Sequence, residues 1–218
     1  QRQGEMYWVA KITRGLENGR FVLYKQAIIP ADETSGRVKR WEFLLRLLDD
    51  DGTVLAPDTF IPAAERYNLM IDVDRWVTQN AFAYISQLLA TWDGVDDPGM
   101  FSINLSHATV NDVSFYTYIR DLQVKHKVPP QRVCFELNEA ATFNTAGNAQ
   151  EFIRRIKEQG FRIALDDFGA GLSSFAYLGV VPVDFVKIDG SFVSGLNREP
   201  VNYAIIEAIN RIGHVTGL

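Results

Sequence analysis

The stretch RIALDDFGAGLSSFAYL, Arg162 to Leu178, sets two adjacent acids at the end of a short apolar run, directly before a loop of glycines and serines. Through the rest of the chain, short β-rich runs of this kind alternate with longer helical patterns. Alternation of strands and helices with short connections is typical of an α/β fold with a parallel sheet. The stretch therefore predicts a strand that ends at Asp166 and Asp167, on the edge of the sheet where α/β proteins place their sites.

Six strands and five helices are predicted along the chain. The strands are expected over 20–29, 38–48, 99–106, 132–138, 161–167 and 184–189, and the helices over 57–67, 71–92, 108–126, 146–159 and 199–212. Asn144, Thr145 and Asn148 offer N-cap chemistry to the fourth helix, and Gly160 is placed to end it. The polar turn PADETSGR joins the first two strands, so an antiparallel hairpin is expected there. Six strands suit an open doubly wound sheet, because a closed eight-stranded barrel takes about 250 residues.

The composition limits the classes of function. The chain has 218 residues, of which 47% are hydrophobic, and this suits a soluble protein with a substantial core. A net charge of −5 argues against a nucleic-acid-binding surface. A single cysteine, Cys134, excludes an intramolecular disulfide and a Cys-rich zinc site. With no long apolar run and no signal-peptide pattern, a cytoplasmic domain is expected.

Polar side chains recur inside the predicted strands. Because side chains alternate between the faces of a strand, Glu136 shares its face with Cys134 and Asn138, and Glu42 shares its face with Arg46. A single acid in a strand is commonly an end residue in contact with water. A set of charged and amide groups among apolar neighbours instead predicts a shared site at the carboxyl ends of the strands. Its members are Glu42, Asn104, Glu136, Asp166, Asp167, Lys187 and Asp189.

The residue types in this set indicate a chemistry. Carboxylates and an amide, without Cys or His, form an oxygen-ligand shell suited to Mg²⁺ or Mn²⁺. Asp166 and Asp167 can each reach a different ion, and two ions can clamp the attacking and leaving oxygens of a phosphoryl displacement. Lys187 then either balances the carboxylates or helps to activate a water molecule.

Other readings of the opening stretch fail. Asp167-Phe168-Gly169 matches the metal-binding triplet of protein kinases, but the catalytic loop and the glycine-rich loop of kinases are absent. GAGLSS lacks the terminal GK[ST] of a Walker A loop, and Ser174 stands where a dinucleotide fingerprint has its third glycine. The glycines are better explained by a mobile loop over the site, with Ser173 and Ser174 as local hydrogen-bonding groups.

The motifs together resemble the EAL domain family, the phosphodiesterases of cyclic di-GMP. The family's E-x-L-x-R, N-x-S, E-L-T-E, D-D-F-G-T-G-Y-S-S, K-I-D and Y-x-Q-P-I motifs correspond here to WEFLLRL, FSINLS, FELNEAA, LDDFGAGLSSFAYL, FVKIDGSFV and YKQAI. The segments occur in the family's order and cover the chain from about Phe21. The resemblance implies a TIM-like (β/α) barrel with an antiparallel first strand.

The resemblance also implies an activity and roles for single residues. The implied reaction is metal-dependent hydrolysis of cyclic di-GMP to linear pGpG in bacterial signalling, with two Mg²⁺ or Mn²⁺ ions. The implied metal ligands are Glu42, Asn104, Glu136, Asp166 and Asp167, with Asp189 joining the shell of the second ion. Lys187 is expected to help activate the hydrolytic water, and Glu139 to anchor the loop at 168–175. Arg46 is expected to hold a substrate phosphate, and Gln26 to lie in the nucleotide pocket.

The chain departs from the family pattern at three places. Phe43 replaces alanine in the signature, but by alternation it points away from Glu42, so only a packing change is expected. Asn138 replaces a threonine, while both acids of that segment remain. The sequence ends at Leu218, before the last two strand–helix units, a metal-site glutamate and part of the guanine pocket that the family leads us to expect. Residues 21–218 are thus expected to form an EAL domain that is incomplete at its C-terminal end.

Residues 1–20 are expected to form a lead-in helix or linker, with Tyr7, Trp8, Ile12 and Leu16 on one face. This helix either caps its own barrel or links it to an upstream sensory or diguanylate-cyclase (GGDEF) domain. The family further implies a homodimer, and tethering to a membrane only through domains outside this sequence.

Two alternatives to the phosphodiesterase stay open. One is a catalytically silent EAL domain that binds cyclic di-GMP as a receptor or acts as a protein-interaction module. The other is a barrel lyase that uses Lys187 as a Schiff base. The acids expected around Lys187 would raise its pKa, which disfavours a nucleophilic amine.

Overall fold

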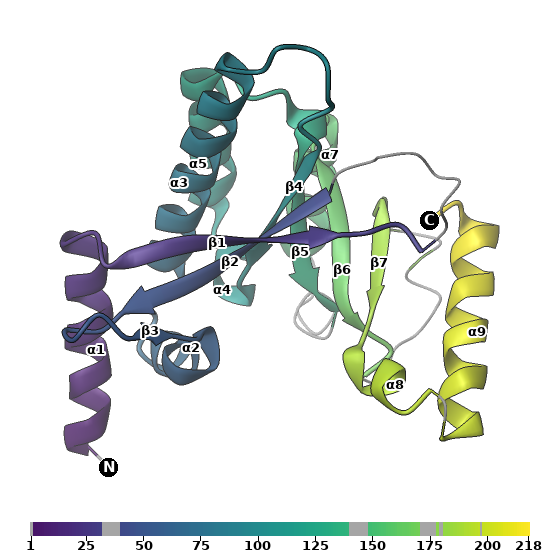
Figure 1. The fold of residues 1–218 in the computed structure, drawn as a ribbon, viewed down its shortest axis with the longest axis horizontal. Coiled ribbons are helices and arrows are strands. Elements are labelled where there is room, and N and C mark those ends of the chain that lie inside the picture. Colours follow the sequence, from purple (N-terminus) through teal and green to yellow (C-terminus); the bar gives the residue numbers. More distant parts are fainter. Residues whose placement is uncertain (1, 32–39, 140–147, 171–177, 179–180, 197) are drawn as a thin grey trace.

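The computed structural model describes residues 2–31, 40–139, 148–170, 178, 181–196 and 198–218. A single curved sheet organises the fold (Figure 1). Its strands are β1 (Phe21–Ile28), β2 (Arg40–Leu48), β3 (Val54–Leu55), β4 (Met100–Leu105), β5 (Val133–Asn138), β6 (Arg162–Phe168) and β7 (Phe185–Ile188). The order across the sheet is β1-β2-β4-β5-β6-β7, with β3 paired to β2.

Strand pairing follows the predicted topology. β1 and β2 form an antiparallel hairpin in which Gln26 lies opposite Glu42. The pairs β2–β4, β4–β5, β5–β6 and β6–β7 are all parallel. The predicted six strands are thus confirmed to within two residues at each described end. The short strand β3 was not predicted, because two residues carry no period for a pattern to show.

Helices cover the outer face of the sheet. They are α1 (Arg2–Glu17), α2 (Pro57–Arg66), α3 (Met70–Ala90), α4 (His107–Val110), α5 (Val113–His126), α7 (Asn148–Glu158), α8 (Gly190–Ser194) and α9 (Pro200–Thr216), with the 3-10 turn η1 (Pro130–Arg132) before β5. In Figure 1, α1 stands at one end of the molecule and α9 at the other, beyond β7. None of the described helices combines the length and the apolar character that a membrane span requires.

The core lies between the outer face of the sheet and the long helices. Ile103 and Phe135 from the strands and Phe82 from α3 are completely buried there. Phe43, which replaces the alanine of the signature, is 4% exposed, and its ring stacks on Phe101 with 5.5 Å between the centroids. Burying one such side chain contributes about 1.5–3 kcal/mol. The prediction that Phe43 alters packing on the face away from Glu42 is therefore confirmed.

The helix predicted over 108–126 is wrong in one respect, because it consists of two helices. α4 ends at Val110, and Asp112 begins α5 by accepting a hydrogen bond from the backbone N–H of Ser114 at 2.9 Å. An aspartate is more favourable at the N-cap of a helix than in the interior of one, so the chain begins a new helix here. Gly160, two residues beyond α7, has a φ of +89° and ends that helix as predicted. Asn148 is the first residue of α7, while Asn144 and Thr145 lie outside the described residues.

The N-terminal helix packs against its own domain. Ile12 is completely buried, and Trp8 and Leu16 are partly buried against the core. Tyr7 does not share this face: it is 53% exposed, and its hydroxyl accepts a hydrogen bond from Lys11 at 2.7 Å. The expectation of four apolar residues on one face is wrong for Tyr7, because a tyrosine can leave the core when its hydroxyl finds a polar partner.

Candidate active site

Lys187 on β7 brings together carboxylates from three other strands. Its ammonium nitrogen Nζ lies 2.5 Å from Glu136 Oε2 on β5, 3.1 Å from Glu42 Oε2 on β2 and 3.3 Å from Asp166 Oδ2 on β6. We call Glu42, Glu136, Asp166 and Lys187 the Lys187 cluster. Its three acids are separated from the lysine by between 21 and 145 residues in sequence. Their convergence on one face of the sheet was predicted from strand alternation, but Glu42 is the third residue of β2 and does not lie at the carboxyl end of its strand.

Asn104 extends the cluster along β4. Its side-chain Nδ2 donates a hydrogen bond to Glu42 Oε1 at 2.9 Å. The sheet register places Asn104 beside Glu136 and places Ser102 beside both Glu42 and Cys134. Parallel neighbours in register point their side chains to the same face, so the pairing of the backbone alone fixes these amide and carboxylate groups together.

Asp166 and Asp167 lie next to each other in sequence, yet both contact residues of the site. In a regular strand, neighbouring side chains point to opposite faces. Asp167 instead has a φ of +55°, in the left-handed region, and the register between β6 and β7 shifts between Leu165 and Phe168. This irregularity lets Asp167 Oδ2 accept a hydrogen bond from Asn138 at 2.8 Å while Asp166 reaches Lys187.

The electrostatics of the cluster follow from burial and crowding. Burial raises the pKa of Glu136, which is only 2% exposed; the carboxylate of Glu42 adds to this rise and Lys187 opposes it. Burial also raises the pKa of Asp167, with the charges of Asp166 and Asp189 adding to it. For Lys187, burial favours a lower pKa, but Glu136, Asp166 and Glu42 outweigh it and raise the pKa. Lys187 is thus a cation at neutral pH.

Glu139 and Asp189 hold backbone at the rim of the site. Glu139 is 4% exposed, and its Oε2 accepts a hydrogen bond from the N–H of Gly169 at 3.1 Å. The contact joins Glu139 to the start of the loop that it was expected to anchor; residues 171–177, including Ser173 and Ser174, lie outside the described residues. Asp189 caps α8 by accepting from the N–H of Ser191 at 2.8 Å, and this hydrogen bond lowers its pKa.

Of the two residues expected to bind substrate, Gln26 is paired with Glu42 across the hairpin, whereas Arg46 lies four positions further along β2. The guanidinium of Arg46 lies over the ring of Tyr24, 5.3 Å from its centroid, and donates to the carbonyl oxygen of Leu45 at 2.8 Å. Gln26 is exposed on β1. Both stand on the hairpin, on the side chain face of β1 and β2 that Glu42 also occupies.

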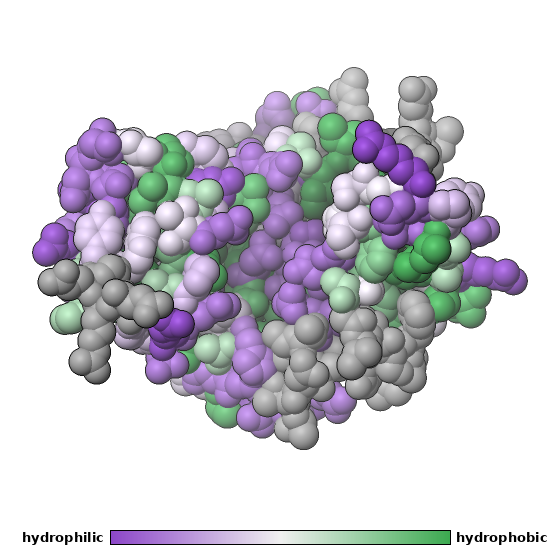
Figure 2. Space-filling view, turned by 90° about the horizontal axis from the view of Figure 1, so that it is seen from below, coloured by the Kyte–Doolittle hydropathy of each residue, from purple (hydrophilic) through white to green (hydrophobic). Residues whose placement is uncertain are grey.

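A cavity of about 500 Å³ opens beside the cluster. Its wall combines apolar side chains such as Leu44 and Ile61 with the polar Asn104, Asn138 and Asp74. Figure 2 looks at the molecule from below and shows hydrophilic surface running into a hollow near the middle of this face. Asp74 and Ser106 on this wall were not among the predicted site residues. Asp74 stands four residues after Met70, on the face of α3 that is buried, and an acid at such an apolar spacing is a signal that could have found it.

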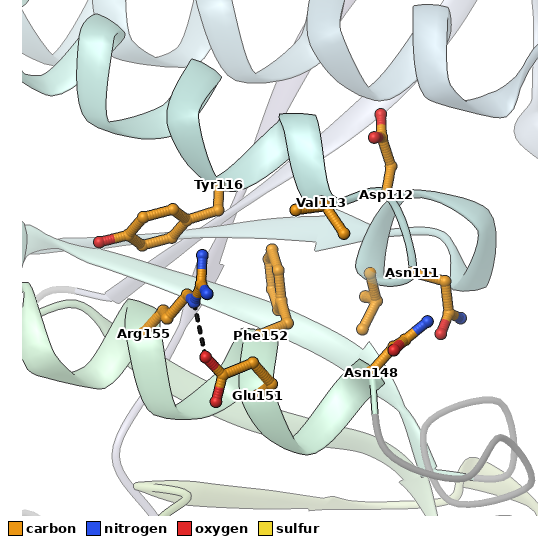
Figure 3. A pocket seen from close by; sticks show the side chains of 9 residues that line it. Asn111, Asp112, Val113, Tyr116, Asn148, Glu151, Phe152 and Arg155 are labelled. Atoms are coloured by element: carbon orange, nitrogen blue, oxygen red, sulfur yellow. Dashed lines mark hydrogen bonds and ion pairs between the residues drawn. The ribbon is translucent and has the colours of Figure 1, made fainter.

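Two other hollows lie away from the Lys187 cluster. One, of about 70 Å³, is lined by the turn between α4 and α5 and by α7, where Glu151 is held by Arg155 at 2.7 Å (Figure 3). The other, of about 310 Å³, lies between α1 and the end of β2, and Arg20 at its edge pairs with Asp50. Neither contains a residue of the predicted site.

The oxygen donors of the site are of the kind that binds a divalent metal ion. Within the part of the chain that is described, no three His, Cys, Asp or Glu side chains are gathered closely enough to hold an ion alone. Three carboxylates nevertheless lie within 3.3 Å of one positively charged nitrogen. They already converge on a point of positive charge, and every donor is an oxygen, as Mg²⁺ and Mn²⁺ prefer. In chemical type, the residues therefore fit a divalent cation.

The profile of the family described as "EAL domain" matches residues 9–218. The chain belongs to the EAL domain family. This EAL domain is 37% identical over 211 residues to cyclic di-GMP phosphodiesterase PdeB of Shewanella oneidensis. The matched region covers 97% of this chain and 24% of PdeB. The domain is 30% identical to cyclic di-GMP phosphodiesterase PdeA of Borreliella burgdorferi, over 92% of this chain and 29% of PdeA. The chain thus spans about a quarter of the length of these relatives.

Solved EAL structures share the fold. The phosphodiesterase PaMucR in its c-di-GMP complex superposes with a TM-score of 0.88 at 25% identity, covering 97% of this chain and 84% of that one. The FimX EAL domain from Pseudomonas aeruginosa bound to c-di-GMP superposes with a TM-score of 0.85 at 26% identity, covering 96% and 82%. The α/β architecture of this EAL domain, with its antiparallel first strand, is consistent with their TIM-like barrel.

Proposed function

We propose that this EAL domain hydrolyses one phosphodiester bond of cyclic di-GMP to give linear pGpG, with divalent metal ions. The observation that carries the proposal is the Lys187 cluster, because it unites four strands at the end of the sheet where α/β enzymes act. The names of PdeB and PdeA and the c-di-GMP complexes of PaMucR and FimX support the choice of substrate.

The metal would be held by the carboxylates and the amide of the site. Glu42, Asn104, Glu136, Asp166 and Asp167 are proposed as ligands, and Asp189 as a further one near Asp167. A bound pair of divalent ions would supply the Lewis acidity that polarises the scissile phosphate and favours deprotonation of water. Asp166 and Asp167 lie at the end of the same strand, so their carboxylates could bind two neighbouring metal ions.

Lys187 acts in this proposal as a fixed cation. Because the surrounding carboxylates raise its pKa, Lys187 stays protonated and donates hydrogen bonds. A protonated lysine cannot take a proton from water, but it can orient the attacking oxygen and stabilise the negative charge that develops on the phosphate. The raised pKa also argues against the Schiff-base lyase, which needs a neutral amine.

Arg46 and Gln26 are proposed to bind the substrate. A guanidinium is suited to a phosphate because it presents several donors in one plane. Arg46 lies two positions beyond Leu44, which lines the cavity beside the cluster, so a nucleotide in the cavity could place its phosphate between Arg46 and the carboxylates. Glu139 is proposed to keep the loop after Gly169 in place above the nucleotide.

A receptor for cyclic di-GMP is the second candidate. It is favoured by one observation: Lys187 already neutralises part of the carboxylate charge, and a site stabilised in this way can bind a nucleotide without turning it over. The homodimer, the upstream GGDEF or sensory domain and the cytoplasmic location that the family implies stay predictions.

Product analysis tests the proposal. The full-length protein is incubated with cyclic di-GMP and Mg²⁺ or Mn²⁺, with EDTA as a control, and the nucleotides are separated by chromatography. We expect pGpG only when metal is present. Glu42→Gln should abolish product, whereas Glu158→Gln, an exposed acid on α7, serves as the matched control and should leave it unchanged.

The same samples separate the two candidates. Cyclic di-GMP that is bound but not cleaved, with or without metal, would establish the receptor instead. An absence of both product and binding would contradict both candidates.

A further inference from the structure

Asp74 is a buried carboxylate for which the proposed reaction has no use. It lies near the start of α3 and is only 4% exposed. Its neighbour Arg75 points elsewhere, with Nη2 2.8 Å from Ser114 Oγ and 3.7 Å from Asp112 Oδ2. Among the described residues, no ammonium or guanidinium group forms an ion pair with Asp74. A buried charge without a cation is costly, so its hydrogen-bond partners must account for its presence.

Those partners all belong to the turn that follows β4. Asp74 Oδ2 accepts a hydrogen bond from the backbone N–H of Ser106 at 2.8 Å. Burial raises the pKa of Asp74 to about 6, and the polar groups of Ser106 and Thr109 beside the carboxylate act in the opposite direction. The hydroxyl of Ser106 donates a hydrogen bond to Thr109 Oγ1 at 3.1 Å. Ser106 in turn caps α4, since its Oγ accepts from the N–H of Thr109 at 3.3 Å.

This turn is the direct continuation of the strand that carries Asn104. The ladder between β4 and β5 ends at the pair Leu105 and Leu137, so the N–H of Ser106 is the first one beyond the sheet. Asp74 supplies the acceptor that the next strand no longer offers. A charge-assisted hydrogen bond of this kind is roughly twice as strong as one between neutral groups. Asp74, Asn104 and Ser106 also line the same cavity.

We infer that Asp74 is a positioning residue: by tying α3 to the first N–H after β4, it fixes the strand end from which Asn104 reaches Glu42 and the site. The inference rests on the proposed function for what the site binds, but its geometry is independent of turnover. In this inference Asp74 acts through the backbone of the turn, by its hydrogen bond with the N–H of Ser106.

Mn²⁺ binding by variants of the full-length protein tests the inference. Residues that orient metal ligands typically change metal affinity 10–100-fold, so Asp74→Ala should raise the Kd for Mn²⁺ by about tenfold or more. Asp74→Asn keeps an oxygen that can accept from Ser106 and should restore most of the affinity. The Kd is measured by electron paramagnetic resonance of free Mn²⁺, and the melting temperature is recorded for each variant.

Thr78→Val is the matched control. Thr78 is completely buried one turn further along α3, and its Oγ1 donates to the backbone oxygen of Asp74 at 2.7 Å. This variant should lower the melting temperature without changing the Kd for Mn²⁺. If it raises the Kd as much as Asp74→Ala does, the effect is general loosening of α3 and the inference is overturned.

The remaining outcomes are also decisive. An unchanged Kd in folded Asp74→Ala overturns the inference and leaves the proposed function intact. If Asp74→Ala does not fold, Thr109→Val removes one hydroxyl from the same network: a raised Kd then supports the inference, and an unchanged Kd overturns it. A wild-type protein that binds Mn²⁺ without producing pGpG contradicts the proposed function alone, because the Kd series still reports on Asp74. A wild type that binds no Mn²⁺ contradicts both.

Discussion

Two ionic clusters occupy opposite ends of β6 and β7, and they are balanced in opposite ways. In the Lys187 cluster, one cation faces three carboxylates. In what we call the Asp184 cluster, one carboxylate faces two cations: Asp184 Oδ1 lies 2.6 Å from Lys157 Nζ and 2.8 Å from Arg162 Nη1. The backbone N–H of Ile163 completes this second cluster with a hydrogen bond of 2.8 Å to Asp184 Oδ2.

The difference separates a site for chemistry from a site for stability. Burial acts to raise the pKa of Asp184, but Lys157, Ile163 and Arg162 outweigh it, and the net pKa is lowered. The carboxylate of Asp184 is therefore more stable in the folded protein than in the unfolded chain. The carboxylate of Glu136, whose pKa is raised, is instead less stable in the folded protein than in the unfolded chain. An excess of carboxylates lowers the stability of the folded protein unless a further cation binds among them. A metal site requires such an excess of negative charge.

The largest expected effect contrasts the two clusters by their acids. Replacing a proposed metal ligand should cost at least as much as replacing a residue that orients one, so Glu136→Gln should lower the turnover of cyclic di-GMP by about 100-fold or more. Asp184→Asn should leave the turnover of folded protein within about twofold, because its cluster lies at the opposite strand ends. Steady-state kinetics of both variants measures this. Equal losses in the two variants would break the comparison.

The next effect contrasts the clusters by their lysines. Lys187→Met leaves three carboxylates without their cation and should cost about 3 kcal/mol of unfolding free energy. Mn²⁺ should recover much of this loss, because it can replace the missing charge. Lys157→Met also removes a cation, but Asp184 keeps Arg162, and Mn²⁺ should bring no recovery. Urea unfolding with and without Mn²⁺ shows which holds, and recovery in Lys157→Met would contradict the distinction.

A smaller effect concerns stability alone. Asp184→Asn removes the charge that joins α7 to β6 and should lower the unfolding free energy by about 2 kcal/mol, since hydrogen bonds to charged groups contribute about 1.5–3 kcal/mol each and the amide keeps part of them. Glu136→Gln should cost less or even stabilise, because it relieves the crowding of carboxylates. Urea denaturation of both variants provides the comparison, and a greater loss in Glu136→Gln would reverse it.

The smallest effect is the pH dependence of the difference in stability between the wild type and Asp184→Asn. Because the pKa of Asp184 is lowered on folding, its contribution is present above its ordinary value of 3.8 and is lost as the pH falls through the folded value. The stability difference between wild type and Asp184→Asn should therefore shrink below about pH 4. Glu136 behaves oppositely: its folded pKa is raised, so its contribution is full below 4.5 and lost as the pH rises. Unfolding measured from pH 3 to pH 7 tests both directions, and a difference for Asp184 that grows on acidification would contradict the assignment.

The two clusters also differ in how well the sequence predicted them. Strand alternation and the motif resemblance placed Glu42, Glu136 and Lys187 on one face, and the structure joins them within ion-pair distance. The Asp184 cluster was not predicted, because its cations come from the end of α7 and the start of β6, where charged residues are ordinarily solvated. The contacts of Asp74 were not predicted for a similar reason, because its partners lie more than thirty residues away along the chain.

The sequence alone determined the order of the strands and helices, the hairpin at the start and the residue types that meet at the candidate site, because periodicity and residue type are local properties. Only the tertiary structure decided the break before Asp112, the left-handed turn at Asp167 and the acceptor that Asp74 gives to Ser106. The turn at Asp167 and the contact of Asp74 with Ser106 depend on a register or a hydrogen bond that two distant segments make together, whereas the break before Asp112 is fixed by a cap within its own segment. A backbone group is satisfied by whatever the fold brings near it, and no pattern in one segment can state what that will be.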